Sequence, residues 1–204
     1  MPRLDLPAAG RSVEALRLTV APGRGNELTG TAETRPATGH FATEHGGKMT
    51  TQPVSLYGMG LLGGLGPHKW VDRSMLDKAE AKLPDGALPL IVDGGAVLEA
   101  SRANLFAVRD GALFTPPLDG RILPGITRMR VLEIAEEVGI DASEAELSHD
   151  DLRAADEVFL TGSVRGVEPV SALDGTPLAT RGDLSTRLSK RLRLAWTGAR
   201  AALR

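Results

Sequence analysis

Two segments of the sequence combine glycine with hydroxyl side chains, a combination that suits the binding of a phosphate group. In the first segment, Gly125 precedes a run with helical spacing, and Thr127 follows two residues later. The start of a helix offers free backbone N–H groups, so these groups and the Thr127 hydroxyl together predict a phosphate-binding turn. In the second segment, residues 161–163 (TGS) follow the apolar run 157–160, which is typical of a buried strand, and form another hydroxyl-rich turn.

Two charged residues stand out by their surroundings. Glu99 interrupts an apolar strand (VLEA), where an unpaired carboxylate would be costly. The alternative is a glutamate on an edge strand, with its side chain facing water. Lys69 is one of five lysines and lies between the loop breakers Gly66-Pro67 and Trp70, a context that predicts a half-buried side chain. For a lone lysine the alternative is a solvated side chain, which the residues alone favour.

The strands that position these residues follow from alternation and turn residues. Residues 105–108 and 112–115 form the two strands of a predicted hairpin. The dipeptide Asp110-Gly111 between them allows positive φ at both central positions of a tight turn. Two further strands are predicted over residues 87–92 and 96–99.

Three helices are predicted around these strands. Asp72 is expected to cap a helix that runs to about residue 82, and Ser148 to open a short helix through a variant capping box. The third helix follows Gly125 and is expected to end at Gly139. Its inward face is predicted from the spacing of five apolar residues, Ile126, Met129, Leu132, Ala135 and Val138.

The glycine-rich segment 58–63 (GMGLLG) matches the dinucleotide-binding pattern G-x-G-x-x-G. That pattern requires a helix directly afterwards, so that the N-terminus of the helix faces the pyrophosphate. Here Gly64, Gly66 and Pro67 follow, and such a run is incompatible with a helix. We therefore interpret the segment as a flexible loop that delivers Lys69.

Composition narrows the class of protein. The 204 residues are enough for a sizeable core, and the net charge of −2 gives no electrostatic basis for binding nucleic acid or an anionic membrane. The absence of cysteine excludes disulfides and thiolate metal sites and fits a reducing compartment. No apolar run is long enough to span a membrane. His40 and His45 lack a third ligand at useful spacing, so no metal site is expected.

Four features occur in a specific order along the chain: Lys69, then Glu99 in VLEAS followed by ANLF, then LPGITR, then TGS. This order resembles the class IV (fold-type IV) aminotransferases, which use pyridoxal 5′-phosphate (PLP), and it is dense over residues 83–170. The resemblance implies an α/β fold, the large domain of these enzymes, which is a mixed sheet or pseudo-barrel with flanking helices of the D-amino acid aminotransferase type. It also implies a cytoplasmic homodimer that acts on a small-molecule amino substrate.

The resemblance assigns roles to individual residues. Lys69 matches the catalytic lysine that forms a Schiff base with PLP, and Glu99 matches the glutamate that keeps the pyridine nitrogen protonated. Leu123 matches the aliphatic residue that packs on the cofactor ring, and Asn104 matches an asparagine that we interpret as a structural hydrogen-bonder. The other cofactor-binding residues are Arg73, then Gly125, Ile126 and Thr127 in one phosphate turn, and Thr161, Gly162 and Ser163 in the second.

Within the family, the residues after the lysine differ between branches. This chain has Lys69-Trp-Val-Asp72-Arg73, a K-x-x-[ND]-R pattern that looks closer to 4-amino-4-deoxychorismate lyases than to branched-chain aminotransferases, which resemble K-x-x-x-N-Y. The resemblance therefore implies a lyase that eliminates pyruvate and forms 4-aminobenzoate on the folate route. The alternative is a class IV aminotransferase acting on branched-chain or D-amino acids.

The N-terminal part of the sequence differs from the family pattern. Residues 13–20 are predicted to form a strand, and residues 21–51, which are rich in Gly, Thr, Pro and Glu, a long loop or partly disordered segment. We expect an N-terminal remnant of the family's small domain (1–50) and a PLP-binding large domain (51–204). A truncated, weakly active or inactive protein with the PLP fold is therefore a further alternative.

Overall fold

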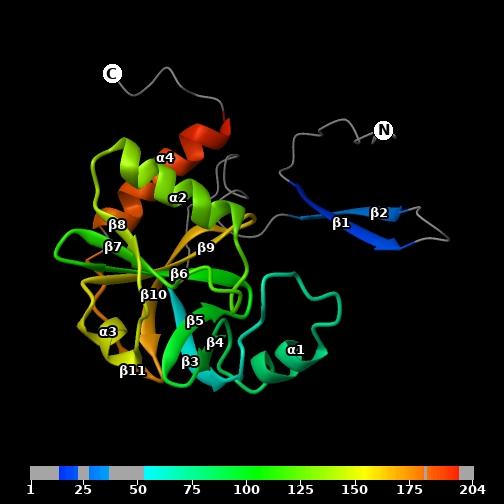
Figure 1. Ribbon diagram of the computed structural model, residues 1–204, viewed down its shortest axis with the longest axis horizontal. Helices are drawn as coiled ribbons and strands as arrows, with labels where there is room; N and C mark the ends of the chain where they lie inside the picture. Colours follow the sequence, from blue (N-terminus) through cyan, green and yellow to red (C-terminus); the bar gives the residue numbers. More distant parts are fainter. Residues whose placement is uncertain (1–13, 23–27, 37–52, 182, 198–204) are drawn as a thin grey trace. The chain divides into compact units, whose positions relative to one another are not determined.

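A computed structural model describes residues 14–22, 28–36, 53–181 and 183–197, and the chain divides into two compact units, Met1–Thr50 and Thr51–Arg204 (Figure 1). In the first unit, β1 (Glu14–Pro22) and β2 (Leu28–Pro36) pair as antiparallel strands. Strand β1 confirms the predicted strand over residues 14–20 and extends it to Pro22. Strand β2 lies where a loop was predicted, so that prediction is wrong for its nine residues, because pairing with β1 outweighs a weak local pattern. His40 and His45 lie outside the described residues.

The second unit is built on a mixed sheet that closes on itself. Strand β3 pairs in parallel with both β10 and β4, and antiparallel pairs then connect β4 to β5, β5 to β6, β6 to β9 and β9 back to β10. Six strands therefore form a ring, with β7 and β8 continuing the sheet from β6 and β11 pairing with β10. The strands are β3 (Val54–Gly60), β4 (Leu88–Asp93), β5 (Ala96–Ala100), β6 (Ala103–Arg109), β7 (Ala112–Thr115), β8 (Ala142–Glu144), β9 (Glu157–Gly162), β10 (Gly166–Leu173) and β11 (Thr176–Pro177).

Alternation along the strands separates an inner core from two outer ones. Leu105 and Leu160, which are opposite each other on β6 and β9, belong to the inner core. Their neighbours Phe106 and Phe159 stack on the outer face with ring centroids 5.2 Å apart, beneath α2 and α4. A smaller outer core around Leu98 holds the short helix α1. The helices are α1 (Ser74–Glu80), α2 (Ile126–Glu137), α3 (His149–Ala154) and α4 (Asp183–Thr197), and Figure 1 shows α2 and α4 side by side.

Local sequence signals account for several of these elements. Asp110 and Gly111 have φ values of 53° and 79°, as the predicted hairpin turn between β6 and β7 requires. Ser148 and Asp151 form the predicted reciprocal capping box at the start of α3. Both predictions are confirmed. Strand β3 runs through Gly60 and the next helix begins at Ser74, so no helix directly follows the G-x-G-x-x-G pattern.

The predicted inward face of α2 is wrong in its first turn. Ile126 and Met129 are 69% and 53% exposed, whereas Ala135 is buried as predicted, together with Val131 and Ile134. Apolar residues occur on more than one side of this helix, so spacing alone did not select the buried side correctly. The side that faces the sheet also carries the buried Arg128.

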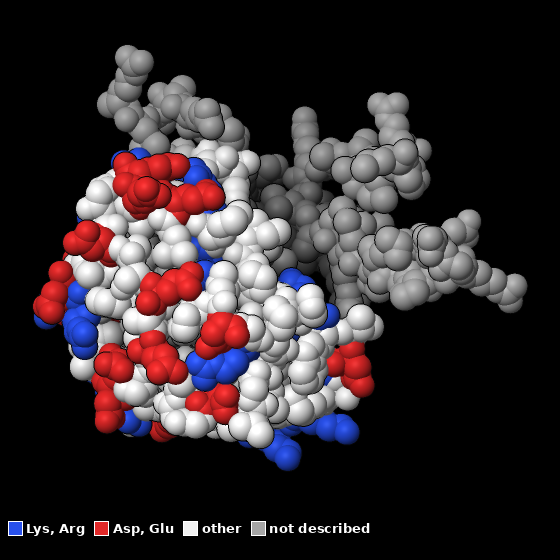
Figure 2. All heavy atoms as spheres, viewed as in Figure 1, with Lys and Arg blue, Asp and Glu red and all other residues white. Residues whose placement is uncertain are grey.

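Charged residues are interspersed over the surface of the second unit, and Figure 2 shows acidic and basic side chains intermingled on one face. Among the residues that the structure describes, no helix has the length and apolar character needed to cross a membrane. Within the same residues, no group of three or more histidine, cysteine or acidic side chains is arranged to hold a metal ion.

Candidate functional site

A row of buried polar side chains crosses three strands of the ring. Glu99 on β5 lies opposite Asn104 on β6, and Asn104 lies opposite Thr161 on β9. Side chains of directly opposite residues point to the same face of a sheet, and here it is the outer face, since Phe106 is two residues from Asn104 along β6. All three polar residues are nearly inaccessible to solvent.

The loop that leads into α2 closes over this row. The side-chain amide of Asn104 donates to Glu99 Oε2 at 3.1 Å and to the Leu123 carbonyl at 2.8 Å. The Leu123 N–H in turn donates to Glu99 Oε1 at 3.1 Å. Next to this network, a Cβ atom at Gly125 would lie 2.0 Å from Asn104 Oδ1, so a side chain at position 125 would displace Asn104. We refer to Glu99, Asn104, Leu123, Gly125, Thr127 and Thr161 as the barrel-wall cluster.

Two hydroxyl groups in this cluster have no hydrogen-bond partner among the described residues. Thr127 and Thr161 are both 2% exposed, and the Oγ1 atom of each is buried and unpaired. Helix α2 begins at Gly125 without a side-chain cap, so its first N–H groups are also available. Buried polar groups are normally paired, so each of these donors is available to an acceptor oxygen that a ligand brings. These donors fit a phosphate group.

Glu99 has an unusual electrostatic environment. Burial raises the pKa of Glu99 to about 8, and the hydrogen bond from the Leu123 N–H opposes this shift only in part. No cationic side chain contributes to this pKa. A buried carboxyl group without a cation is suited to a ligand that brings a protonated nitrogen. A protonated pyridine ring fits that requirement.

Two arginines hold the loop that carries Leu123. Arg128 is buried, and its guanidinium donates to the Pro116 carbonyl at 2.9 Å and pairs with Glu144 at 2.9 Å. Its Nε is a third buried atom without a partner among the described residues.

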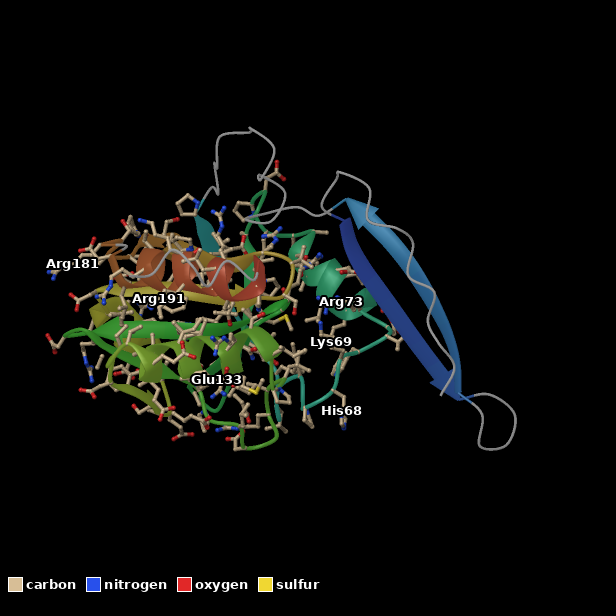
Figure 3. All side chains as sticks on the ribbon, turned by 90° about the horizontal axis from the view of Figure 1, so that it is seen from above. His68, Lys69, Arg73, Glu133, Arg181 and Arg191 are labelled. Atoms are coloured by element: carbon tan, nitrogen blue, oxygen red, sulfur yellow. The ribbon has the colours of Figure 1, made fainter. Side chains whose placement is uncertain are left out.

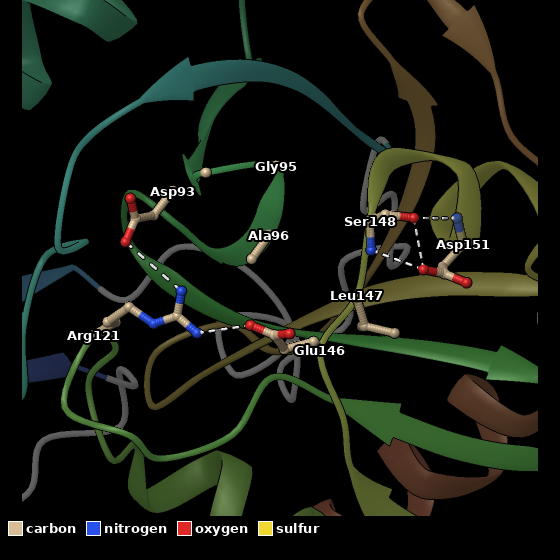
Figure 4. Close-up of a pocket in the computed structure, with 9 residues that line it drawn as sticks. Asp93, Gly95, Ala96, Arg121, Glu146, Leu147, Ser148 and Asp151 are labelled. Carbon is tan, nitrogen blue, oxygen red and sulfur yellow. Dashed lines mark hydrogen bonds and ion pairs between the residues drawn. The ribbon is translucent and has the colours of Figure 1, made fainter.

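Arg121, two residues before Leu123, extends into a pocket of about 470 Å³ at the end of the β4–β5 hairpin (Figure 4). There it lies between Asp93 at 3.7 Å and Glu146 at 3.2 Å. These ion pairs fix the loop from the side of the hairpin.

The segment that carries Lys69, residues 61–73, has no regular secondary structure. We call it the lysine segment. Its glycines lie against the loop that precedes Leu123: Gly66 N–H donates to the Arg121 carbonyl at 3.1 Å, and a Cβ atom at Gly64 would lie 2.2 Å from the same oxygen. The Trp70 indole donates to the Leu65 carbonyl at 2.7 Å.

Lys69 itself is exposed, so the prediction of a half-buried side chain is wrong. The indole of the adjacent Trp70 is 40% exposed and turned toward Leu65. Figure 3 shows Lys69 and Arg73 at one end of the second unit, with Arg181 at the opposite end. The guanidinium of Arg73 donates to the Ser101 carbonyl at 2.9 Å, in the turn between Glu99 and Asn104.

The structure thus brings some of the predicted residues together and leaves others apart. Glu99, Leu123 and Gly125 meet around Asn104. Thr161 and Gly162 belong to the end of β9 rather than to a turn, because their backbones still pair with β10. Two other predicted phosphate-turn residues have exposed side chains; they are Ile126 and Ser163.

The interpretation of Asn104 as a structural hydrogen-bonder agrees with its contacts, since its amide connects the buried carboxyl group to the loop over it. Glu80 was not found from the sequence. Glu80 on α1 accepts hydrogen bonds from Ser101 and Arg102, which are 21 and 22 residues further along the chain. No local sequence signal indicates an ion pair over such a separation.

The fold and the site agree with one family of enzymes. Residues 72–173, half of the chain, match the family model of amino-transferase class IV, so the chain belongs to this family. The predicted family and its α/β fold are confirmed. Lys69 lies three residues before the matched region.

Relatives within the family carry several activities. The chain is 46% identical over 81 residues to the branched-chain-amino-acid aminotransferase of Escherichia coli K12, covering 40% of this chain and 26% of that protein. It is 32% identical over 107 residues to the D-alanine aminotransferase of Bacillus licheniformis, covering 52% of this chain and 38% of that protein. The crystal structure of 4-amino-4-deoxychorismate lyase from Pseudomonas aeruginosa superposes with a TM-score of 0.70 at 27% identity, covering 87% of this chain and 70% of that one. The chain therefore spans well under half the length of the curated relatives it matches.

Proposed function

We propose that the barrel-wall cluster binds PLP, with the phosphate at Thr127 and Thr161 and the pyridine nitrogen at Glu99. The observation that carries the proposal is that two buried threonine hydroxyls without partners among the described residues occur together with a buried carboxyl group that no cation accompanies. Solved relatives support it, since a class IV branched-chain aminotransferase was crystallised with a phosphopyridoxyl ligand.

Each residue of the site has a definite task in this proposal. The Thr127 and Thr161 hydroxyls and the first N–H groups of α2 donate to the phosphate oxygens. Glu99 holds a proton on the pyridine nitrogen, and Asn104 and the Leu123 N–H orient its carboxyl group. Leu123 excludes water from one side of the ring, and Lys69 Nζ binds the aldehyde and moves protons at the substrate. PLP, when bound, supplies an electron sink for the carbon from which a bond is broken.

The first candidate reaction is the elimination of pyruvate from 4-amino-4-deoxychorismate, which leaves the aromatic product 4-aminobenzoate. Asp72 and Arg73, three and four residues after Lys69, support this assignment through the K-x-x-[ND]-R pattern, as does the likeness to the Pseudomonas aeruginosa lyase. In this reaction the Lys69 amine transfers the protons, and the formation of an aromatic ring drives the reaction forward.

The second candidate is amino-group transfer between a branched-chain or D-amino acid and a 2-oxo acid. The 46% identity to the Escherichia coli branched-chain-amino-acid aminotransferase favours it, and the same barrel-wall cluster serves both reactions. For either reaction we infer a homodimer in the cytoplasm, with a small amino compound as substrate. The distinguishing measurement is product formation: release of 4-aminobenzoate and pyruvate for the lyase, or appearance of a 2-oxo acid for the transferase.

The proposal is tested by locating the covalent bond to PLP. The Lys69 amine and the aldehyde condense to a C=N bond with release of water, and borohydride reduces that bond to a stable amine. Peptide mass mapping should then place the adduct on Lys69. Lys69→Ala should abolish the adduct, whereas the control Lys78→Ala, on the exposed surface of α1, should leave it unchanged. An adduct on another lysine, or none at saturating PLP, would contradict the assignment.

A further inference from the structure

A cluster of four polar side chains connects the helix after the lysine segment to the turn between β5 and β6. Glu80 on α1 accepts from Ser101 Oγ at 2.7 Å and from Arg102 Nε at 2.9 Å, and its second carboxylate oxygen pairs with Arg102 Nη2. Arg73, at the start of α1, donates to the Ser101 carbonyl at 2.9 Å and lies 3.9 Å from Glu80. We call these four residues the Glu80 clamp.

The Glu80 clamp adjoins both parts of the proposed cofactor site along the chain: the residues that would bind the ring, and the lysine that would bind the aldehyde. On one side, Ser101 and Arg102 occupy the turn that begins two residues after Glu99 and ends two residues before Asn104. On the other side, Arg73 is four residues after Lys69. A shift of the clamp would therefore change the distance between the lysine amine and the ring site without altering the ring site itself.

Apart from the Glu80 clamp, the smaller outer core around Leu98 holds this side of the molecule, and α1 contributes one residue to it. Helix α1 has seven residues, and Leu76 is its one buried side chain. An isolated helix of this length is unstable in water, so its position depends on tertiary contacts. The Glu80 side chain is only 15% exposed, and Ser101 is buried, so solvent screens this interaction less than a surface ion pair.

The electrostatics of Glu80 agree with a fixed, charged clamp. Burial alone would raise the pKa of Glu80, but hydrogen bonds from Arg102 and Ser101 and the charge of Arg73 lower it below its ordinary value. The carboxylate is therefore ionised at neutral pH and accepts hydrogen bonds through both oxygens.

We propose that Glu80 is a positioning residue, which holds the Lys69 amine at the distance from the barrel-wall cluster at which it can condense with the aldehyde of PLP. This inference rests on the proposed function. Capture of an aldehyde depends on the alignment of the two reacting atoms, and a misplacement of about 1 Å lowers the efficiency of such a step by up to roughly a hundredfold. Binding of the ring and phosphate depends on β5, β6, β9 and α2, which the clamp does not form.

The experiment separates these two events with two probes on the full chain. PLP measures the binding of the ring and phosphate together with the covalent bond to the lysine, which is detected by the absorbance of the C=N adduct and by borohydride trapping. 4-Deoxypyridoxine 5′-phosphate, which has a methyl group in place of the aldehyde, reports on ring and phosphate alone through calorimetric titration. In Glu80→Gln we expect the affinity for this analogue to stay within about twofold, while adduct formation falls roughly tenfold or more.

Three further variants define the result. Glu133→Gln is the matched control, because it breaks an exposed arginine–glutamate pair of 2.8 Å on α2, away from the clamp. Glu80→Asp, which keeps the charge, should recover part of the adduct formation. Ser101→Ala, which removes one hydrogen bond to Glu80, should give a smaller loss of adduct formation. It replaces Glu80→Gln as the test if the circular dichroism spectrum of Glu80→Gln differs from that of the wild type.

The outcomes distinguish this inference from the proposed function. Equal losses for PLP and the analogue in Glu80→Gln would show that Glu80 acts through the fold in general and would overturn the positioning role. Unchanged adduct formation in Glu80→Gln would overturn it as well. If the wild-type chain binds neither probe, the proposed function itself fails, and the positioning role fails with it.

Discussion

The barrel-wall cluster and the lysine segment carry the two halves of the proposed chemistry, and different interactions hold them. The barrel-wall cluster lies on three paired strands and on the loop and first turn of α2 that close over them, and its polar side chains are almost fully buried. The lysine segment has no regular secondary structure and presents an exposed amine. It is fixed through glycine contacts to the Arg121 carbonyl, one indole hydrogen bond and the Glu80 clamp that follows.

This difference separates the non-covalent binding of the cofactor, by the barrel-wall cluster, from its covalent bonding to Lys69. A site on adjacent strands keeps its geometry whether or not a ligand is present, since neighbouring side chains and backbone pairs fix every group. A segment held by a few polar contacts is more easily displaced, because it buries little apolar surface. We therefore expect changes in the barrel-wall cluster to alter non-covalent affinity, and also stability where they break its contacts, and changes near the lysine segment to alter covalent bonding with little effect on either.

The largest effect is expected for Glu99→Gln without ligand. With a folded-state pKa near 8 and an ordinary value of 4.5, Glu99 stays protonated in the fold while the unfolded chain ionises. The contribution of Glu99 to stability is therefore greatest below pH 4.5 and decreases as the pH rises toward 8, by an amount on the order of a few kcal/mol. Urea unfolding from pH 5 to 8 should show this loss in the wild type, and a much shallower loss in Glu99→Gln.

The slope of stability against pH, rather than stability at one pH, is the decisive quantity. Burial also raises the pKa of Glu168, but this residue contributes to the slope in both proteins, so the difference between them isolates Glu99. Parallel curves for the two proteins would mean that Glu99 is solvated in solution. The barrel-wall cluster would then not differ from the lysine segment in burial at its charged residue.

Gly125→Ala should have the next largest effect. The new Cβ would lie 2.0 Å from Asn104 Oδ1, so Asn104 must move and lose its hydrogen bonds to Glu99 and Leu123. Overpacking of this kind costs about 1–3 kcal/mol, measurable as a lower urea midpoint, and the affinity for 4-deoxypyridoxine 5′-phosphate should fall as well. Gly60→Ala is the matched control, because a Cβ there meets nothing within 4 Å. Equal stability of the two variants would contradict the close packing around Asn104.

The same contrast explains what could be predicted from the sequence. The hairpin turn at Asp110-Gly111 and the capping box at Ser148 were predicted correctly, because each depends on residues a few positions apart. The burial of Glu99 was also predicted, since its apolar neighbours Val97, Leu98 and Ala100 carry the strand into the core. The order of motifs along the chain indicated the family, which the match to residues 72–173 confirms.

The errors have two physical causes. Strand β2 pairs with β1 across only five residues, so it was missed because its local pattern is weak. The face of α2 depends on contacts between distant parts of the chain: Nη2 of the buried Arg128 donates to the Pro116 carbonyl and pairs with Glu144, and no local pattern reveals these partners. The Glu80 clamp was missed for the same reason. Sequence patterns thus described the barrel wall better than the segment attached to it.

The smallest effects in this series are expected for Thr127→Val and Thr161→Val, and they distinguish affinity from stability most clearly. Each change removes a buried hydroxyl that has no partner among the described residues. The stability of the ligand-free chain should therefore stay the same or rise slightly. Affinity for 4-deoxypyridoxine 5′-phosphate should fall about tenfold in each variant, because a hydrogen bond to a charged phosphate contributes about 1.5 kcal/mol or more.

Thr115→Val is the control, for which we expect the opposite result. Its hydroxyl donates to the Leu105 carbonyl at 2.8 Å, so its loss should lower stability and leave the affinity unchanged. If all three variants lose stability and none loses affinity, the two threonines serve the fold alone, and the phosphate does not bind at this wall.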